Sequence, residues 1–381
     1  MPKAIVLGAG MVGSVMAADL ASDPDFTVTV ADSRAQSLAA AKVRAPRLAT
    51  LQADLSDPRA VRELVAGYDL VLGAIASPIG FQTLRAVIEA GKNYCDITFM
   101  AEDAADLDEL AKQHGVTCVV DCGVAPGMSH MLAGYEVGQF DECRSIEIYV
   151  GGLPRNRRWP FQYKAPFAPS DVIEEYTRPA RIVEHGKIVV REALSEPELM
   201  NFEGVGTLEA FNSDGLRSLA YSLKVPFMKE KTLRYPGHIE LMRVFRATGL
   251  FSKDEIEIGE VKVRPLEVTS ALMFPLWQLQ PGEEELTVMR VIARGLKNGR
   301  EERHIWDLLD VTDQRTNTTS MARTTAFPCT IMARMVARGE FQSAGVNLPE
   351  AVGARTGMIE RVIAEHERRG VQYSRRVETV D

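Results

Sequence analysis

The chain has 381 residues, enough for about two or three domains of ordinary size. Its composition is 46% hydrophobic and 25% charged, which is average for globular proteins and excludes disordered, collagen-like and coiled-coil chains. The formal net charge of −8 repels nucleic-acid phosphates, and no apolar run reaches the roughly 18–20 residues of a membrane span. We therefore expect neither a nucleic-acid nor a membrane partner.

Residues 1 to about 125 alternate between short apolar runs rich in Val and Ile and amphipathic helical stretches. This pattern predicts a parallel sheet covered by helices on both faces, a doubly wound α/β Rossmann domain at residues 1–124. Six strands are expected, in the runs KAIVLGAG, FTVTVAD, LATLQADL, DLVLGAIAS, KNYCDITF and VTCVVDCG.

After Pro126 the sequence takes on the character of antiparallel strands. The run ARIVEHGKIVV turns at His185-Gly186, and LTVMRVIARGLKNGREERHIW turns at Asn298-Gly299, two dipeptides typical of hairpins. We expect an α+β substrate domain with an antiparallel sheet at residues 125–318. The remainder, residues 319–381, opens with helical periodicity and is expected to be a helical segment that packs back on the Rossmann domain.

The five cysteines are odd in number and lie in apolar surroundings: Cys95, Cys118, Cys122, Cys143 and Cys329. This usage fits a reducing compartment better than a disulfide framework, so we expect a cytoplasmic protein. Because Cys118 and Cys122 do not form a C-x-x-C pair and no histidine cluster lies near them, we expect no metal site.

A G-x-G-x-x-G motif follows the first predicted strand directly and opens the first predicted helix. Gly8 permits the tight turn, Gly10 lets the backbone approach a pyrophosphate, and Gly13 lets helix and strand pack closely. The helix N-terminus, with Met11 and Val12, is expected to present N–H groups to the phosphates. The alternative is a glycine turn that binds nothing or binds a flavin.

Asp32 ends the second strand 19 residues after Gly13, where its carboxylate can accept hydrogen bonds from the adenosine ribose and repel a 2′-phosphate. The sequence therefore favours NAD as cofactor, with NADP the alternative because Arg34 is able to accommodate that phosphate. Asp54 and Ser77 follow the third and fourth strands, at the edge where an open α/β sheet binds ligands, and are predicted to contact the cofactor. For Asp54 the alternative is a helix cap or a solvated loop carboxylate.

Four further stretches occur in a recognisable order: GVAPGMSH at 123–130, VGGLP at 150–154, KTLRYPGH at 231–238 and SMARTTAFP at 320–328. With the glycine motif they resemble the saccharopine dehydrogenase-like superfamily of NAD(P)-dependent amine and imine oxidoreductases, over nearly the whole chain. Within it the chain is most similar to the L-lysine 6-dehydrogenases.

The resemblance implies the same domain arrangement as the periodicity, with NAD as cofactor and a homo-oligomer, dimer or tetramer. It also implies oxidative deamination of the ε-amine of L-lysine, which yields allysine, cyclising to piperideine-6-carboxylate, and ammonia.

Glutamate-forming saccharopine reductases usually carry an aspartate where this chain has Ala125, and arginines in two segments where it has Ser170 and Ser213. The missing arginines remove partners for extra substrate carboxylates. The alternative activity is reductive condensation of an amine with an aldehyde, as in saccharopine reductase or carboxynorspermidine dehydrogenase. A rival of another class is a nucleotide sensor without catalysis.

Hydride transfer from an amine requires the nitrogen lone pair, so an ε-ammonium group of reference pKa about 10.4 must first lose a proton. Asp96, at the end of the fifth strand, is expected to face the cofactor crevice and to orient or deprotonate the amine, or else to be a structural cap. His130 and His238 lie in the recognised motifs and are candidates for proton transfer, with a structural hydrogen-bonded histidine the alternative for each. The other histidines are expected in solvent: His114, His185, His304 and His366.

Arg234 is the candidate partner of the substrate α-carboxylate, because a guanidinium group offers bidentate geometry; a surface salt bridge is the alternative. Tyr163 and Lys164, in the loop-like segment FQYKAPF, are expected to close over the site, although a loop lysine is commonly solvated. Thr324 either contacts the nicotinamide amide or caps the returning helix.

Overall fold

The computed structural model describes residues 1–280 and 282–380, which divide into two compact units. The first unit comprises Met1–Gly138 and Ala322–Val371, and the second comprises Gln139–Met321 and the residues from Gln372 onward. The first unit thus extends past the expected boundary at 124. The expected C-terminal segment, 319–381, divides between the two units.

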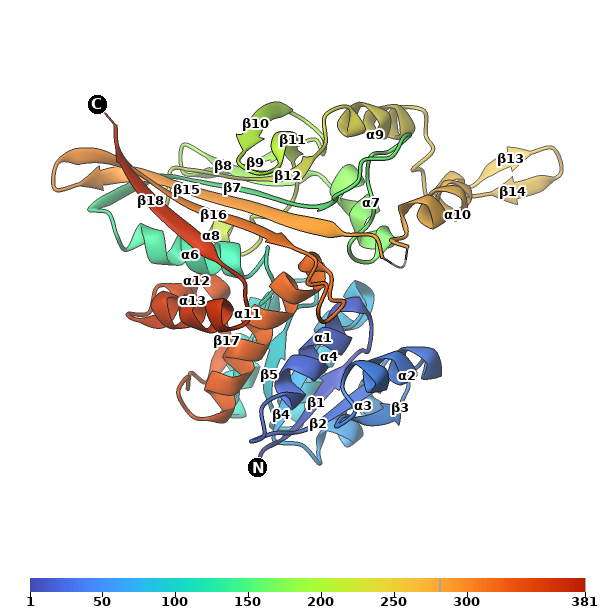
Figure 1. Cartoon of the computed structure of the whole chain (residues 1–381), viewed down its shortest axis with the longest axis vertical. Coiled ribbons are helices and arrows are strands. Elements are labelled where there is room, and N and C mark those ends of the chain that lie inside the picture. The colour runs from blue at the N-terminus through green and yellow to red at the C-terminus, as the bar shows by residue number, and fades with distance from the viewer. Residues whose placement is uncertain (281, 381) are drawn as a thin grey trace. The chain divides into compact units, whose positions relative to one another are not determined.

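The first unit is built on a parallel sheet whose strand order is β17-β6-β5-β4-β1-β2-β3 (Figure 1). Its strands are β1 (Lys3–Leu7), β2 (Thr27–Asp32), β3 (Ala49–Gln52), β4 (Leu70–Gly73), β5 (Asn93–Asp96), β6 (Thr117–Val119) and β17 (Gly345–Asn347). The six predicted strands all form. The additional strand β17 comes from the C-terminal part of the chain and pairs with β6 in parallel.

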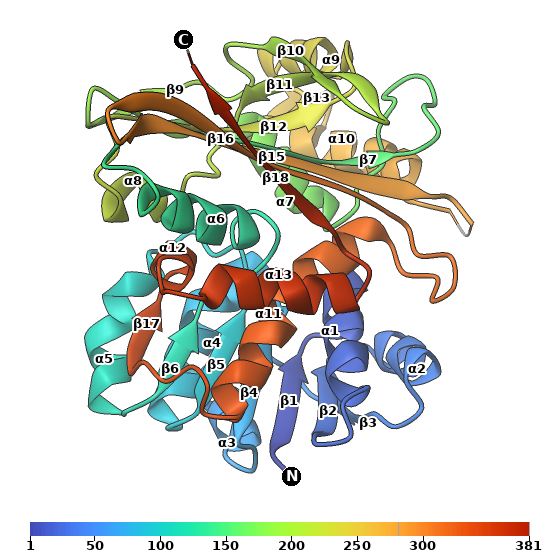
Figure 2. The ribbon, with the colours of Figure 1, turned by 60° about the vertical axis from the view of Figure 1, so that its left-hand side comes forward.

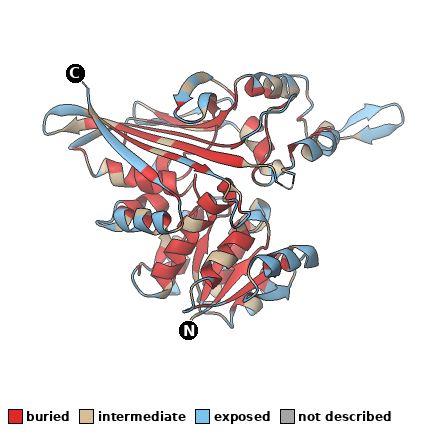
Figure 3. Ribbon diagram, in the orientation of Figure 1, coloured by how far each residue is buried: buried red, intermediate tan, exposed pale blue. Residues whose placement is uncertain are grey.

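The helices of the first unit are α1 (Met11–Ala21), α2 (Ala35–Arg44), α3 (Pro58–Val65), α4 (Ser77–Glu89), η1 (Ala104–Leu107), α5 (Asp108–Gln113), α6 (Met128–Val137), α11 (Ser320–Ala337), α12 (Pro349–Gly353) and α13 (Met358–Arg368). The chain runs from β1 toward one edge of the sheet and from β4 toward the other. With right-handed crossovers, this reversal places α1 and α2 on one face and α4 and α5 on the other. Figure 2 shows helices on both sides, and Figure 3 shows that the central strands are buried.

The long helix α11 is fastened to α1 by a buried ion pair. Arg334 Nη1 donates to Asp19 Oδ2 at 2.7 Å, and the Thr330 hydroxyl donates to the same oxygen at 2.6 Å. Two arginines of this region, Arg334 and Arg369, hold the pKa of Asp19 below its ordinary value although burial opposes them. The returning part of the chain is therefore bonded to the helix that follows the glycine turn.

The second unit contains a large mixed sheet with a main strand order of β10-β11-β12-β7-β15-β16-β18, to which β8 and β9 are added beside β12. Its strands are β7 (Glu142–Pro154), β8 (Ala180–Glu184), β9 (Lys187–Arg191), β10 (Glu198–Phe202), β11 (Gly206–Asn212), β12 (Phe227–Arg234), β15 (Glu285–Lys297), β16 (Arg300–Val311) and β18 (Tyr373–Thr379). Its other elements are α7 (Pro169–Thr177), α8 (Leu219–Ser222), α9 (His238–Ala247), α10 (Pro265–Trp277) and the hairpin of β13 (Ile256–Ile258) and β14 (Val261–Val263).

Both predicted hairpins form. His185 and Gly186 have φ values of 50° and 73°, and Asn298 and Gly299 have φ values of 51° and 75°. Positive φ at both central residues matches the twist of antiparallel strands, which is why these dipeptides predict the turns.

Two features of this sheet differ from the expectation. Strand β12 pairs with β7 in parallel, so the sheet is mixed rather than purely antiparallel. Residues 373–379, which lie in the segment expected to be helical, form the edge strand β18 and pair with β16. Both pairings join residues far apart in the chain, and local periodicity carries no information about them.

Within the described residues, no helix has both the length and the apolar character needed to cross a bilayer.

Candidate active site

The glycine turn joins β1 to α1 and is closely packed at two of its three glycines. A Cβ on Gly8 would lie 2.2 Å from the carbonyl oxygen of Ala74, and a Cβ on Gly13 would lie 2.1 Å from the carbonyl oxygen of Gly8. Gly8 also has a φ of 100°, a conformation that glycine alone adopts readily. At Gly10, by contrast, no described atom lies within 4 Å of the Cβ position. The backbone there borders open space, as close approach of a pyrophosphate requires.

The N-terminus of α1 is exposed beside this space. The first intrahelical bond runs from Ser14 N–H to the Gly10 carbonyl at 3.1 Å, so the N–H groups of Met11 and Val12 point out of the helix end. The first turn of α1 carries no acidic side chain. These residues fit an anionic diphosphate.

Asp32 lies at the end of β2 and faces the glycine turn. Its Oδ2 accepts the Ala9 N–H at 2.8 Å, and its Oδ1 accepts the Arg34 N–H at 2.8 Å. The Arg34 side chain is 68% exposed, with Nε 3.4 Å from Asp32 Oδ1. The structure therefore places a carboxylate next to the turn, where the ribose of a dinucleotide binds in this fold.

The remaining two predicted cofactor residues also lie at this edge of the sheet. Asp54 follows β3 and is exposed, and its Oδ1 accepts the backbone N–H and the hydroxyl of Ser56 at 2.9 and 2.7 Å. These two hydrogen bonds lower the pKa of Asp54, so its contacts are those of a loop carboxylate. Ser77 is the first residue of α4, which begins with a proline in its first turn.

Asp96 is aligned with the glycine turn by strand register. Leu7 of β1 pairs with Gly73 of β4, and Gly73 pairs with Asp96 of β5. The Asp96 side chain fills the space that a side chain on Gly73 would need, since a Cβ there would lie 2.6 Å from Asp96 Oδ1. Because Gly8 follows Leu7, the carboxyl of Asp96 and the glycine turn share one edge of the sheet.

The Asp96 carboxyl is fully buried and only partly satisfied. Its Oδ1 accepts the Thr98 N–H at 2.7 Å, whereas Oδ2 has no hydrogen-bond partner in residues 1–280 and 282–380. Burial raises the pKa of Asp96 to about 7, against the Thr98 hydrogen bonds, and the charge of Asp121 raises it further. A carboxyl with this pKa exchanges a proton near neutrality.

The two candidate histidines are both buried and bonded. His238 has Nε2 3.0 Å from the Tyr176 hydroxyl and Nδ1 2.8 Å from the Phe161 carbonyl oxygen. Burial lowers the pKa of His238 to about 3, so the ring is neutral and structural. His130 has Nδ1 2.9 Å from the Ser129 hydroxyl.

The expectation that the other histidines are solvated is wrong for two of them. His304 and His366 are fully buried. His304 stacks on Phe140 with ring centroids 4.3 Å apart, and His366 Nδ1 lies 2.7 Å from the Val362 carbonyl oxygen.

Arg234 ends β12 and is 2% exposed, so the alternative of a surface salt bridge is wrong. Its Nη2 donates to Glu175 Oε2 at 2.5 Å, and its Nε donates to the Tyr176 hydroxyl at 3.0 Å. The guanidinium carbon lies 4.4 Å from the ring centroid of Tyr163. The structure thus brings together two of the predicted substrate residues, Arg234 and Tyr163, in the second unit.

Lys164 and Thr324 have surroundings that the sequence did not predict. Lys164 Nζ donates to the Gln278 carbonyl at 2.9 Å and lies 3.5 Å from Glu283, so it is bonded rather than solvated. Thr324 is fully buried inside α11, which begins at Ser320, so it is not a helix cap. The neighbouring Thr325 methyl group lies 3.1 Å from the Cβ position of Gly123, in the first recognised motif.

The sequence did not indicate two buried acids of the second unit, Glu230 and Glu285. Burial raises the pKa of both Glu230 and Glu285 to about 8. Glu230 Oε2 accepts the Ser213 hydroxyl at 2.7 Å, and Glu285 Oε1 accepts the Met321 N–H at 2.6 Å. Glu230 directly precedes the motif at 231–238, whereas no sequence signal marks Glu285. The burial of an acid depends on distant strand pairing.

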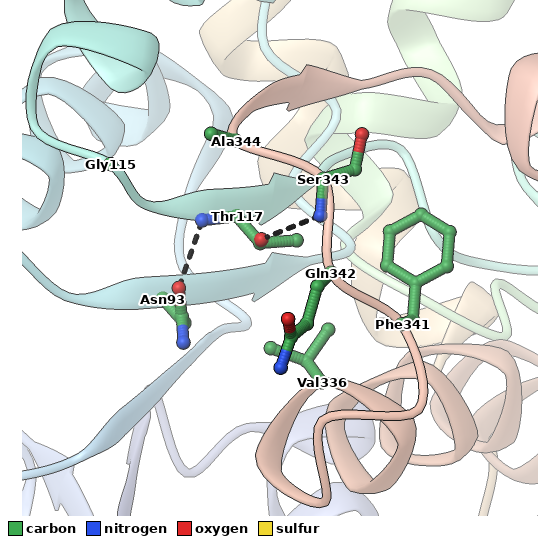
Figure 4. A pocket seen from close by; sticks show the side chains of 8 residues that line it. All are labelled: Asn93, Gly115, Thr117, Val336, Phe341, Gln342, Ser343 and Ala344. Atoms are coloured by element: carbon green, nitrogen blue, oxygen red, sulfur yellow. Dashed lines mark hydrogen bonds between the residues drawn. The ribbon is translucent and has the colours of Figure 1, made fainter.

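A polar pocket of about 430 Å³ lies elsewhere in the first unit (Figure 4). It is lined by Asn93 and Thr117, the first residues of β5 and β6, and by residues 341–344. These are the amino ends of parallel strands, opposite the edge that carries the glycine turn. The pocket is therefore separate from the cofactor residues.

The fold and the glycine turn with Asp32 define the class of protein, a nicotinamide-nucleotide-dependent oxidoreductase. The chain belongs to the saccharopine dehydrogenase family. Residues 4–119 match the saccharopine dehydrogenase NADP binding domain, and residues 123–371 match the saccharopine dehydrogenase C-terminal domain. The predicted fold class and family resemblance are confirmed.

Known relatives extend this similarity over different lengths. The chain is 24% identical to the carboxyaminopropylagmatine dehydrogenase of Synechocystis over 91% of this chain and 92% of that protein. It is 28% identical to the L-glutamate-forming saccharopine dehydrogenase of Schizosaccharomyces pombe over 50% of this chain, and 23% identical to bovine alpha-aminoadipic semialdehyde synthase over 98% of it. These matches span 43% and 47% of those two proteins, less than half of each.

The fold also matches the solved structure of apo saccharopine dehydrogenase from Saccharomyces cerevisiae. The TM-score is 0.82 at 17% identity, covering 99% of this chain and 100% of that chain.

Proposed function

We propose that the protein oxidises the ε-amine of L-lysine with NAD, giving allysine and ammonia. The observation that carries this proposal is Asp96, a buried carboxyl with an unbonded oxygen at the same sheet edge as the glycine turn. Amine oxidation needs a base whose pKa lies near the working pH, and burial gives Asp96 a pKa of about 7. His238 is poorly suited to that role because both its ring nitrogens are bonded.

Asp96 has two tasks in this scheme. It takes a proton from the substrate ammonium group, which frees the nitrogen lone pair, and the adjacent carbon then gives up a hydride. Bound NAD supplies the hydride acceptor. The resulting imine adds water and releases ammonia, and Asp96 moves the protons that these steps require.

Lysine as substrate rests on the family resemblance and on the surroundings of Ser213. The resemblance places an arginine of the saccharopine reductases at this position. Here Ser213 donates to the buried Glu230 and contacts the Thr232 hydroxyl at 2.7 Å. This position offers no cation for a second substrate carboxylate, which supports an amino acid with one.

The second candidate is reductive condensation of an amine with an aldehyde. It is supported by the relatives of the chain, which include a carboxyaminopropylagmatine dehydrogenase, a saccharopine dehydrogenase and a carboxynorspermidine synthase. The two reactions differ in their products, because deamination releases ammonia and condensation joins two carbon chains through a secondary amine.

NAD is the proposed cofactor and NADP is the alternative. The family model is described as an NADP binding domain, whereas the Asp32 carboxylate beside the glycine turn would repel a 2′-phosphate. The exposed Arg34 is the residue that favours NADP.

We also propose a cytoplasmic homo-oligomer whose only ligands are small molecules, the amino acid and the cofactor. Exposed apolar side chains of the second unit support self-association: Ile258 and Val261 on the β13–β14 hairpin and Leu272 on α10 are 61%, 61% and 71% exposed. The acidic net charge of −8 speaks against nucleic acid.

The test is formation of NADH or NADPH by the purified protein with lysine, ornithine, saccharopine and diamines, each offered with NAD and with NADP. We expect the highest kcat/KM for lysine with NAD. Activity with saccharopine but not with lysine would replace this proposal with the condensation reaction, and activity with no amine would favour a nucleotide sensor.

A further inference from the structure

Several buried polar atoms of the second unit have no hydrogen-bond partner among the residues that the structure describes. Two of them are Oε2 of Glu285 and the hydroxyl oxygen of Tyr163. Glu285 is 1% exposed and Tyr163 is 3% exposed, so bulk water does not satisfy these atoms. Folded proteins pair nearly all their buried polar atoms, and the exceptions need an explanation.

The two side chains lie in the same part of the unit. Lys164, next to Tyr163, has Nζ 3.5 Å from Oε2 of Glu283, two residues before Glu285. Burial raises the pKa of the Tyr163 hydroxyl and the charge of Glu285 adds to that shift, while Arg234 opposes it. The charge of Glu285 thus acts on the Tyr163 hydroxyl, so the two unpaired oxygens lie within electrostatic range of each other.

A cationic nitrogen is the ligand that suits these atoms. Oε1 of Glu285 already accepts the Met321 N–H at 2.6 Å, and the Thr319 hydroxyl also stabilises the carboxylate and lowers its pKa. Oε2 has no partner within hydrogen-bond distance in the described residues, so it can accept a hydrogen bond from the ligand. An ammonium group has three donors and no acceptor, so it can satisfy a carboxylate oxygen and a phenol oxygen together. Burial raises the pKa of Glu285 to about 8, so the carboxyl is poised to give up its proton when a cation arrives.

Arg234 supplies a positive charge close to Tyr163, which complements the negative charge of Glu285. Its guanidinium carbon lies 4.4 Å from the ring centroid of Tyr163. A guanidinium group has five N–H donors, and the hydrogen bonds to Glu175, Tyr176 and Leu233 use three of them. Donors therefore remain for a carboxylate, so the cluster offers an anion and a cation to a zwitterion.

We propose that Glu285 and Tyr163 bind the α-ammonium group of the amino-acid substrate and so distinguish amino acids from simple amines. The assignment rests on the proposed function. It concerns the α-nitrogen rather than the reacting one, because Asp96 is the carboxyl assigned to the reacting amine. The α-ammonium group stays charged throughout the reaction.

The test compares L-lysine with 6-aminohexanoate, which has the same carboxylate and ε-amine but lacks the α-amino group. Glu285→Gln should lower kcat/KM for lysine by about tenfold to a hundredfold, chiefly through KM, because one charge-assisted contact is lost. The same variant should leave kcat/KM for 6-aminohexanoate largely unchanged. Tyr163→Phe should act in the same direction but more weakly.

Glu284→Gln is the matched control. Glu284 precedes Glu285, and its carboxylate pairs with Arg155 at 2.8 Å, at the surface. This variant removes a carboxylate charge at the adjacent position and should leave kcat/KM for both substrates unchanged. Melting curves of all three variants establish that they are folded.

An equal fall in kcat/KM for both substrates in Glu285→Gln, or no fall for lysine, would overturn the assignment of the α-ammonium site. Neither result would contradict lysine oxidation itself. A wild-type protein that makes no NADH from lysine would instead overturn the proposed function. Calorimetric binding of lysine then decides the assignment: binding that Glu285→Gln abolishes supports it, and lack of binding to the wild type contradicts it.

Discussion

At the end of β2, the two oxygens of Asp32 accept the N–H groups of Ala9 and Arg34, so one carboxylate both holds the glycine turn and faces the ribose position. The structural contact means that truncation alone would damage the turn. Replacement by asparagine removes the charge and keeps one of the two acceptor oxygens, so it disturbs the turn less than truncation does.

We predict that Asp32→Asn weakens NAD binding by about tenfold or more and weakens NADP binding much less, because a charge-assisted ribose contact is lost and repulsion of the 2′-phosphate is relieved. Dissociation constants for both cofactors, from fluorescence titration, provide the measurement. Equal weakening of both cofactors would show that Asp32 only supports the turn.

Asp96 should set the lower limb of the pH profile. Its pKa of about 7 means that the proton-accepting form appears as pH rises through neutrality. The substrate amine, of pKa about 10.4, extends the rise in kcat/KM into the alkaline range. We predict that the kcat/KM profile of Asp96→Asn lacks the rise near pH 7 and that its kcat is at least about a hundredfold lower than that of the wild type. Initial rates from pH 5 to 10 provide the measurement. An unchanged limb in this variant would assign it to another group.

The same carboxyl should reduce the stability of the protein at alkaline pH. The pKa of Asp96 is raised from its ordinary 3.8 to about 7, so the folded state binds a proton that the unfolded state has released. Stability therefore falls as pH rises from about 4 to about 7. Asp96→Asn should raise the melting temperature relative to wild type at pH 8 and leave it nearly equal at pH 4. A difference that does not vary with pH would contradict the buried ionised carboxylate.

Residue spacing was enough to predict the positions of Asp32 and Asp96 at the ends of their strands, because both follow apolar runs in a regular α/β alternation. It was not enough for Glu285 or for His304. Their burial comes from sheet pairing between distant segments, and each looks like an ordinary polar strand residue in sequence.

The turn between β1 and α1 shows what a local motif predicts and what the structure adds to that prediction. The glycine motif predicted the strand, the turn and the helix together, because each glycine answers a different steric demand. The structure distinguishes the two kinds of glycine: the Cβ position of Gly13 is in contact with backbone atoms, whereas that of Gly10 borders open space.

We predict opposite outcomes for alanine at these two glycines. Gly13→Ala places a Cβ 2.1 Å from the Gly8 carbonyl oxygen, so it should lower the melting temperature. Gly10→Ala meets no described atom within 4 Å, so it should melt like wild type yet bind NAD at least about tenfold more weakly, because the methyl group occupies the pyrophosphate position. Normal NAD affinity in Gly10→Ala would place the diphosphate elsewhere.

Elements with local signals were predicted, and elements that depend on distant pairing were not. The turns at Asn298 and His185 are visible in a dipeptide. The parallel pairing of β12 with β7 and the pairing of the edge strand β18 with β16 join partners 65 to 82 residues apart. No local pattern specifies such partners.

At the scale of the molecule, the order of the recognised motifs predicted the family, and the family models cover both parts of the chain. The fold is shared with a saccharopine dehydrogenase at 17% identity. A shared fold does not decide between deamination and condensation, so we expect the choice to depend on side chains such as Ser213.

The most direct test of this account is the ratio of ammonia to NADH formed from L-lysine and NAD by the wild-type protein. Oxidative deamination predicts equal amounts of both, with the carbon product recovered as piperideine-6-carboxylate. NADH consumption without ammonia release, in a mixture of lysine, an aldehyde and NADH that yields a secondary amine, would contradict deamination and identify a condensing enzyme.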